Sequence, residues 1–177
     1  MSEGQRIPRD EALLAAKKIY DILAPICERV SIAGSLRRLQ SEVGDIEIVC
    51  VPMPEVDLLG YSWVNAMHIE RALKSAGYVM GKFNGEHFKQ FEAGPCNCDL
   101  FITTRECWGV IIAIRTGPAD YSRRLVTPRN QNGLLPSHLR VMGGRVMNRS
   151  DGALYDTHEE VDFYQAIGLP YIFPENR

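Results

Sequence analysis

Two acidic residues separated by one position, Asp45 and Glu47, stand at the start of a segment rich in β-branched residues. From Asp45 to Val51, polar and apolar residues first alternate, which is typical of a strand with one buried face. On a strand, residues i and i+2 point to the same face and lie about 6.6 Å apart, at a rise of about 3.3 Å per residue. The pair could therefore hold a hard, oxygen-seeking cation.

A third acid, Asp99, lies in another predicted strand, residues 98–103. If the two strands are neighbours, the three carboxylates suffice for two Mg²⁺ ions, because Mg²⁺ keeps several waters and also takes substrate phosphates as ligands. Such ions activate an attacking hydroxyl and stabilise the charge on a transferred phosphoryl group. The simpler interpretation places Asp45 and Glu47 on the solvated face of an edge strand, with no ligand.

A turn of small residues, Gly34-Ser35, precedes Asp45 by nine intervening residues, and Arg37 and Arg38 follow it. Glycine lets a backbone approach a phosphate closely, and backbone N–H groups, the serine hydroxyl and the arginines can donate hydrogen bonds to phosphate oxygens. A triphosphate held by this turn would lie beside the acidic pair. The turn and the acids together favour a functional site over two unrelated surface features.

These segments resemble the signature of the family X DNA polymerases, within the polymerase beta-like nucleotidyltransferase superfamily. The first part is Ala-Gly-Ser-Leu-Arg-Arg at 33–38 with Val-Gly-Asp-Ile-Glu-Ile at 43–48. Asp99-Leu-Phe-Ile-Thr-Thr, followed by Trp108-Gly and Arg115-Thr-Gly, is similar to the third acidic strand and the entry to the thumb. Ala-Ile-Gly-Leu-Pro-Tyr-Ile-Phe-Pro-Glu at 166–175 is similar to the family's C-terminus. The resemblance covers residues 30–177.

The resemblance implies a DNA polymerase that adds dNTPs to a primer 3′-hydroxyl with two Mg²⁺ or Mn²⁺ ions, in short-gap repair and with low processivity. It implies that Asp45 and Glu47 bind both ions and that Asp99 binds mainly the catalytic one. The nucleotide-binding positions that it implies are Gly34, Ser35, Arg38, Gly44, Thr116, Gly117, Ser122 and Arg123. The arginines assigned to DNA are Arg115, Arg124 and Arg129.

The sequence departs from the family pattern in several places. Glu47 stands where a second aspartate is commoner, and its longer arm is expected to shift the metal preference towards Mn²⁺. Ile114-Arg115 occupies the position of a pair that often includes an aromatic residue acting against ribonucleotides, so sugar discrimination stays open. Asn97 stands where a basic residue is frequent. About thirty residues precede the Gly-Ser turn, so we expect a minimal palm-plus-thumb form without lyase or fingers domains.

The predicted fold class is α/β (α+β): a nucleotidyltransferase palm over residues 1–104, with a mixed sheet and flanking helices, and a small α+β thumb-like domain over 105–177. Apolar spacing predicts a helix that starts at Asp10 as N-cap and bends or ends near Pro25. The other predicted elements are a strand at 30–33, helices at 62–76, 106–114 and 119–126, hairpins at Asn84-Gly85 (type I′) and Gly143-Gly144, and a last helix capped by Thr157-His158-Glu159-Glu160.

The composition, 45% hydrophobic and 24% charged, is that of an ordinary globular protein, and no apolar run approaches the length of about 20 residues that spans a membrane. The net charge of −2 does not by itself indicate nucleic-acid binding. From Arg115 to Arg149, however, there are seven arginines and one acid, Asp120. A cationic segment of this kind suits the phosphates of DNA or, equally, a solvated surface.

Three functions remain open from the sequence. The first is the DNA polymerase, with a primer-template or gapped DNA and a dNTP as partners. The second is a template-independent nucleotidyltransferase that acts on nucleic acid or on another acceptor. The third is a non-catalytic module that binds DNA ends. We expect a monomer without membrane association, located in the cytoplasm or at the nucleoid, of viral or bacterial origin.

Overall fold

The computed structural model describes residues 6–56, 62–64 and 66–177. The chain divides into two compact units, Met1–Thr104 and Arg105–Arg177, which we call the first and the second unit.

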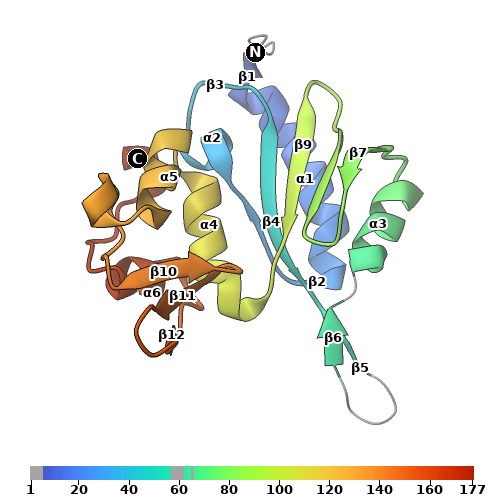
Figure 1. The fold of residues 1–177 in the computed structure, drawn as a ribbon. Coiled ribbons are helices and arrows are strands. Elements are labelled where there is room, and N and C mark those ends of the chain that lie inside the picture. The colour runs from blue at the N-terminus through green and yellow to red at the C-terminus, as the bar shows by residue number, and fades with distance from the viewer. Residues whose placement is uncertain (1–5, 57–61, 65) are drawn as a thin grey trace. The chain divides into compact units, whose positions relative to one another are not determined.

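A five-stranded mixed sheet forms the centre of the first unit, in the order β2-β4-β9-β8-β7 (Figure 1). The strands are β2 (Cys27–Ile32), β4 (Ile46–Pro52), β9 (Asn97–Ile102), β8 (Phe88–Glu92) and β7 (Met80–Asn84). β4 and β9 run parallel, whereas the other neighbouring pairs are antiparallel. A parallel pair needs a long crossover connection, and here that connection contains the helix α3 (Ala66–Ser75).

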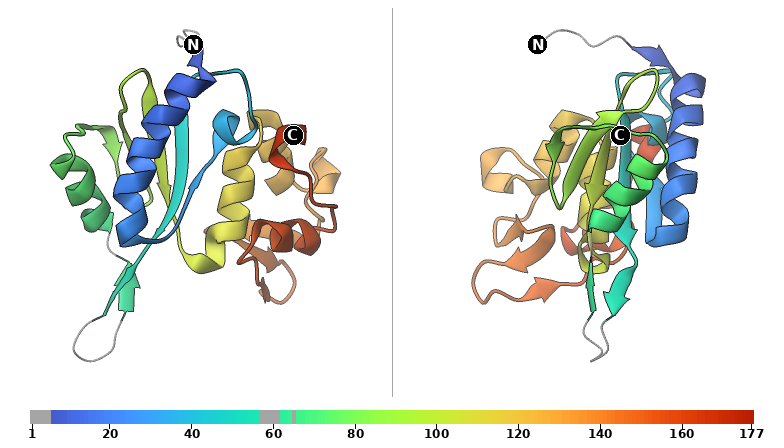
Figure 2. Two further views of the ribbon diagram at one scale, coloured as in Figure 1. Left: turned by 180° about the vertical axis from the view of Figure 1, so that it is seen from behind. Right: turned by 90° about the vertical axis from the view of Figure 1, so that its right-hand side faces the viewer.

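The helices α1 (Arg9–Leu23) and α3 cover one face of this sheet (Figure 2). α1 buries a stripe of residues at helical spacing, namely Ala12, Ala16, Ile19 and Leu23. Alternate residues of the two central strands pack in the same core: Ile46, Ile48 and Cys50 from β4, and Cys98, Leu100 and Ile102 from β9. Because successive strand side chains point to opposite faces, Glu47 and Asp99 lie on the face away from the helices.

Smaller elements complete the first unit. The 3₁₀ turn η1 (Ala24–Ile26) leads from α1 into β2, and the single helical turn α2 (Gly34–Arg37) follows β2. β1 (Ile7–Pro8) pairs with β3 (Glu42–Val43), and β5 (Pro54–Val56) pairs with β6 (Ser62–Val64), both antiparallel.

The second unit has three helices, α4 (Trp108–Thr116), α5 (Ala119–Val126) and α6 (Glu160–Ala166), and a small antiparallel sheet. The sheet contains β10 (Leu139–Met142), β11 (Arg145–Asn148) and β12 (Leu154–Tyr155), and short 3₁₀ turns are found at Arg105–Cys107, Arg129–Gln131 and Pro174–Asn176. Its core includes Val110, Ala113, Leu125, Phe163 and Tyr164. Gly109 lets α4 approach the chain before α6 closely: its N–H donates to the Thr157 carbonyl over 2.9 Å.

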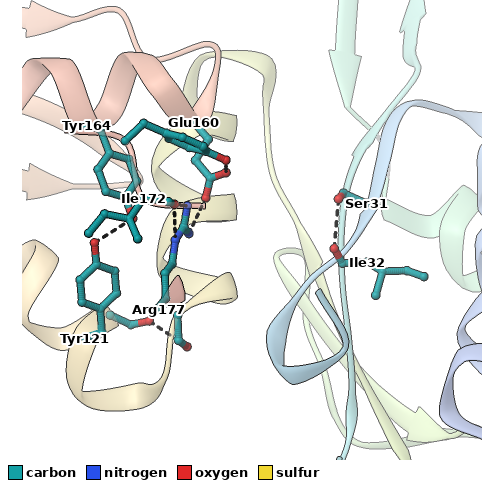
Figure 3. Close-up of polar contacts among 10 residues, drawn as sticks. Ser31, Ile32, Tyr121, Glu160, Tyr164, Ile172 and Arg177 are labelled. Atoms are coloured by element: carbon teal, nitrogen blue, oxygen red, sulfur yellow. Dashed lines mark hydrogen bonds and ion pairs between the residues drawn. The ribbon is translucent and has the colours of Figure 1, made fainter. Parts of the chain in front are cut away.

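A buried ion pair holds the end of the chain in the second unit (Figure 3). Nη1 of Arg177 lies 2.7 Å from Oε1 of Glu160, and the two side chains are 0% and 7% exposed. The same guanidinium donates to the Ile172 carbonyl and lies over the rings of Tyr164 and Tyr171. The Tyr171 hydroxyl donates to the other oxygen of Glu160 over 2.9 Å. The carboxylate of Glu160 is therefore satisfied on both oxygens.

The structure confirms a mixed α and β class with a mixed sheet and flanking helices. The strands predicted around Asp45–Val51 and Cys98–Thr103 are present as β4 and β9, and the helix predicted at 119–126 is present with those bounds as α5. The Gly143-Gly144 hairpin is also confirmed, with positive φ at both glycines. Within the described ranges, no helix combines the length and the apolar character that crossing a bilayer requires.

Several boundaries differ from those predicted. Residues 62–64, expected in a helix, pair as β6 with β5, so α3 begins at Ala66. The helix α1 has Pro8 rather than Asp10 as N-cap, because residues 7–8 pair as a strand with β3 immediately before it. Asp10 lies instead in the first helical turn, where its charge suits the helix dipole.

Two predicted local motifs involve residues other than those predicted. The first hairpin is not a two-residue type I′ turn at Asn84-Gly85, since neither residue has positive φ and residues 85–87 connect the strands. The capping box of α6 consists of Glu159 and Asp162, rather than starting at Thr157. Thr157 is buried and donates from its hydroxyl to the Glu106 carbonyl, so tertiary packing takes it away from the helix end.

Candidate functional site

Glu47 and Asp99 lie directly opposite each other on the parallel strands β4 and β9, where they are register partners. Neighbouring strands lie about 4.8 Å apart, so the two carboxylates start from adjacent backbone positions. Each acid is half-buried, while the residues on either side of it, such as Ile48 and Leu100, are fully buried. The buried neighbours hold the strands in place, and the acids stand on the opposite face.

Gln90 extends this row onto the next strand, because it is the register partner of Asp99 on β8. Its Nε2 donates to Oδ1 of Asp99 over 2.8 Å. The side chains of Glu47, Asp99 and Gln90 thus form one row across three neighbouring strands, β4, β9 and β8, on the face away from α1 and α3.

Asp45 lies one residue before β4, at the end of the strand that carries Glu47. Partial burial of its carboxyl group raises its pKa, although the residue as a whole is exposed. The negative charge of Asp99 raises the pKa further, whereas Arg38 lowers it. Asp45 is therefore within electrostatic reach of both Asp99 and an arginine from the turn after β2.

The three acids also act on a neighbouring thiol. The pKa of Cys98 is raised well above its usual value, first because the thiol is buried and then because of the charge of Asp99, with smaller contributions from Asp45 and Glu47. All three carboxylates thus influence one buried atom. In the described part of the chain, however, no three His, Cys, Asp or Glu side chains are already arranged as a metal-binding group.

The Gly34-Ser35 turn is in direct contact with this row. Gly34 has a φ of +59°, and a Cβ placed on it would lie 2.8 Å from Cδ of Glu47 and would overlap its Oε2. The Ala33 N–H donates to the Glu47 carbonyl over 2.8 Å, and the Arg38 N–H to the Gly34 carbonyl over 3.2 Å. The backbone of the turn is therefore hydrogen-bonded to β4 and lies against the Glu47 carboxylate.

The other predicted phosphate-binding residues of the first unit are Ser35, Arg38 and Gly44. Ser35 and Arg38 are half-buried, and Gly44 is exposed immediately before Asp45. A Cβ at Gly44 would meet no protein atom within 4 Å, so the space beside this backbone is open. The structure thus brings the phosphate-binding residues predicted in the first unit to the same end of β4 as the acids.

The remaining predicted nucleotide-binding residues belong to the second unit. Thr116 is fully buried in the last turn of α4, and Gly117 follows it. The Ser122 hydroxyl donates to the Gly117 carbonyl over 3.2 Å, and a Cβ on Gly117 would lie 2.8 Å from the ring of Tyr121. This turn is therefore held closely against α5.

The predicted DNA-binding arginines differ in their surroundings. Arg124 is exposed on α5, next to Arg123, which pairs with Asp120 over 3.3 Å. Arg115 is half-buried in the last turn of α4.

Arg129 donates to two backbone carbonyls, those of Leu134 over 3.2 Å and Ile167 over 2.9 Å. Its guanidinium thus connects the loop after α5 to the end of α6.

Sequence reasoning missed Gln90. The hairpin around Asn84-Gly85 was predicted, but the residue of β8 that faces Asp99 is set by the pairing of β8 with β9, which was not predicted. Residues 93–96 connect these two strands, and Gln90 pairs with Asp99.

The chain matches no model of a known protein family, and no curated protein shows significant similarity to it.

Proposed function

We propose that this protein is a metal-dependent nucleotidyltransferase of the family X DNA polymerase type, which adds dNTPs to a primer 3′-hydroxyl. The observation that carries the proposal is the register of Glu47 and Asp99 on parallel strands, with the Gly34 backbone against the Glu47 carboxylate. In this arrangement, the acidic pair lies beside the Gly34-Ser35 turn. Only glycine, which has no Cβ, allows the backbone to approach the Glu47 carboxylate this closely.

The donor set fits Mg²⁺ or Mn²⁺, because both ions prefer oxygen ligands and the three acids supply carboxylate oxygens. Asp45, Glu47 and Asp99 would hold the ions. When bound, two ions polarise the attacking hydroxyl and neutralise charge on the leaving phosphate. Asp99, which already accepts a hydrogen bond from Gln90, would stand closest to the incoming primer hydroxyl in this assignment.

The turn residues supply the rest of the proposed nucleotide site. The Ser35 hydroxyl and the Arg38 guanidinium would donate to the β and γ phosphates, and the open space beside Gly44 would admit them. Arg38 already lowers the pKa of Asp45, so its positive charge also favours the ionised form of that acid. The same proposal includes repair synthesis with low processivity, in which Arg124 would contact DNA phosphates.

Primer extension tests the proposal and separates it from the alternatives. The purified chain is incubated with all four dNTPs and Mg²⁺ or Mn²⁺ on a templated primer, a one-nucleotide gap and a single-stranded primer. Addition that follows the template is expected, most efficient at the gap. Equal addition to the single strand would identify a tailing enzyme. No addition to any substrate by a protein that still binds DNA ends would identify a binding module.

A further inference from the structure

We infer that Gln90 is a positioning residue for Asp99, an inference that rests on the proposed function. The contact is specific: Nε2 of Gln90 donates to Oδ1 of Asp99 over 2.8 Å, between register partners on β8 and β9. A carboxylate on a strand can rotate about its Cβ–Cγ bond, and a hydrogen bond to one oxygen restricts that rotation. Gln90 therefore fixes the direction in which Asp99 offers its second oxygen.

The position of Gln90 is itself well determined. Its neighbours along β8, Lys89 and Phe91, are 3% and 1% exposed and pack on the helix-covered face. Phe91 contacts the ring of Tyr78 at a centroid distance of 5.2 Å. On the β7 side, a Cβ on Gly81 would lie 2.8 Å from the Gln90 carbonyl oxygen, so that backbone also packs closely. The backbone of Gln90 is thus held in place by its buried neighbours on β8 and by close packing against β7.

The sheet order explains why the direction matters. β9 lies between β4 and β8, so Asp99 has Glu47 on one side and Gln90 on the other. The bond to Gln90 engages Oδ1, which leaves Oδ2 for a cation shared with Glu47. Because the amide is neutral, it orients Asp99 without adding a positive charge that would compete with the cation. Partners of metal-binding carboxylates commonly act in this way.

Two substitutions separate this role from simple packing. Gln90→Leu removes the donor and keeps the bulk, whereas Gln90→Glu keeps the shape but replaces the donor by an acceptor. Gln165→Leu is the control, because Gln165 is exposed on α6 in the second unit. The readouts are the kcat and KM for dNTP, the affinity for Mn²⁺ measured by electron paramagnetic resonance on the DNA-free protein, and the thermal unfolding midpoint.

Gln90→Leu is expected to bind Mn²⁺ about 10- to 100-fold more weakly, and both Gln90 variants are expected to lose kcat by a similar factor, with KM for dNTP nearly unchanged. The control should match the wild type. A packing role predicts instead that Gln90→Glu behaves like the wild type. Wild-type Mn²⁺ affinity in both Gln90 variants would overturn the inference.

The proposed function fails in a different way. If Asp99→Asn keeps full nucleotide transfer, the assignment of the acids is wrong. If Asp99→Asn is inactive while both Gln90 variants keep the wild-type kcat and Mn²⁺ affinity, only the role of Gln90 is wrong. The Mn²⁺ titration decides the second question even without turnover, because loss of binding in Asp99→Asn but not in the Gln90 variants contradicts the positioning role.

Discussion

The carboxylate of Glu47 lies directly over the backbone of Gly34, so that a Cβ on Gly34 would lie 2.8 Å from Cδ of Glu47 and overlap Oε2. The two residues come from different elements, β4 and α2, and the N–H of Ala33, the residue before α2, donates to the Glu47 carbonyl. An acid one methylene shorter would leave a space at this contact. The length of Glu47 and the absence of a side chain at Gly34 therefore belong together.

The first prediction concerns this contact. Gly34→Ala should cost about 1 to 2 kcal/mol in the free energy of unfolding, because its φ is +59°. It should also reduce kcat/KM by about 100-fold, since the added methyl group displaces the Glu47 carboxylate. The measurement is primer extension together with urea unfolding.

Glu47→Asp provides the matched test of the cause. In a chain that already carries Glu47→Asp, the shorter side chain makes room for the methyl group. The loss of kcat/KM caused by adding Gly34→Ala should then be about tenfold smaller than in the wild-type chain. The corresponding coupling energy in a double-mutant cycle is about 1 to 3 kcal/mol. Independent, additive losses would show that the two residues do not interact in the active protein.

The second prediction concerns a buried lysine in the first unit. Nζ of Lys89 lies 3.3 Å from Oε2 of Glu70 and 2.8 Å from Oδ1 of Asn84, and the Lys89 side chain is only 4% exposed. Glu70→Gln removes its negative partner and should lower the free energy of unfolding by about 1 to 3 kcal/mol. Asp21→Asn, which breaks the exposed pair with Lys17, should cost no more than about 0.5 kcal/mol.

This effect should depend on pH. Hydrogen bonds, first from Lys74 and then from Asn84 and Lys89, lower the pKa of Glu70 to about 2 from its ordinary value of 4.5. A lowered pKa stabilises the folded chain above pH 4.5, and this contribution disappears as the pH falls towards 2. The difference between wild type and Glu70→Gln in urea unfolding should thus be largest near pH 7. If the difference in the free energy of unfolding stayed constant down to pH 2.5, the ionised Glu70 carboxylate would not be the source of the stabilisation.

The third prediction concerns the ion pair of Glu160 and Arg177 in the second unit. Arg177→Ala leaves a carboxylate that is 7% exposed without its cation, and it should destabilise the second unit by about 3 to 5 kcal/mol. Arg123→Ala is the control, because its pair with Asp120 is 73% and 90% exposed and should contribute less than about 1 kcal/mol. Equal losses of stability in the two variants would mean that burial does not make the pair of Glu160 and Arg177 more important for stability than an exposed pair.

The fourth prediction separates the arginines of the second unit. Arg124→Ala should weaken DNA binding and reduce the slope of log K against log salt by about 0.9, since one phosphate contact is lost. Arg129→Ala should instead reduce stability, because its guanidinium donates to the carbonyls of Leu134 and Ile167. Fluorescence anisotropy at several salt concentrations measures the slopes. An unchanged slope for Arg124→Ala would show that Arg124 does not contact a DNA phosphate.

The sequence predicted the elements whose patterns are local. The β-branched residues and the initial alternation after Asp45 indicate β4, and the glycine pair at 143–144 indicates the second hairpin, in which both glycines have positive φ. Such signals need only neighbouring residues. They do not require knowledge of which strand lies beside which.

Features that depend on register were not predictable in this way. The bond between Gln90 and Asp99 follows from the pairing of β8 with β9. The contact of Glu47 with Gly34 depends on where α2 packs against β4. Thr157 looked like a helix cap, but burial against α4 and its bond to Glu106 compete with that role. In each case tertiary packing decides between locally acceptable alternatives.

The most direct test of the central claim is primer extension by Asp99→Asn beside the wild type, on gapped DNA with Mg²⁺ and with Mn²⁺. Asparagine keeps the shape of the side chain but removes the charge that would hold the cation, so transfer should fall at least about 1,000-fold while DNA affinity, measured by anisotropy, stays within about twofold. Transfer at the wild-type rate by Asp99→Asn would contradict the assignment of this acidic row as the catalytic centre.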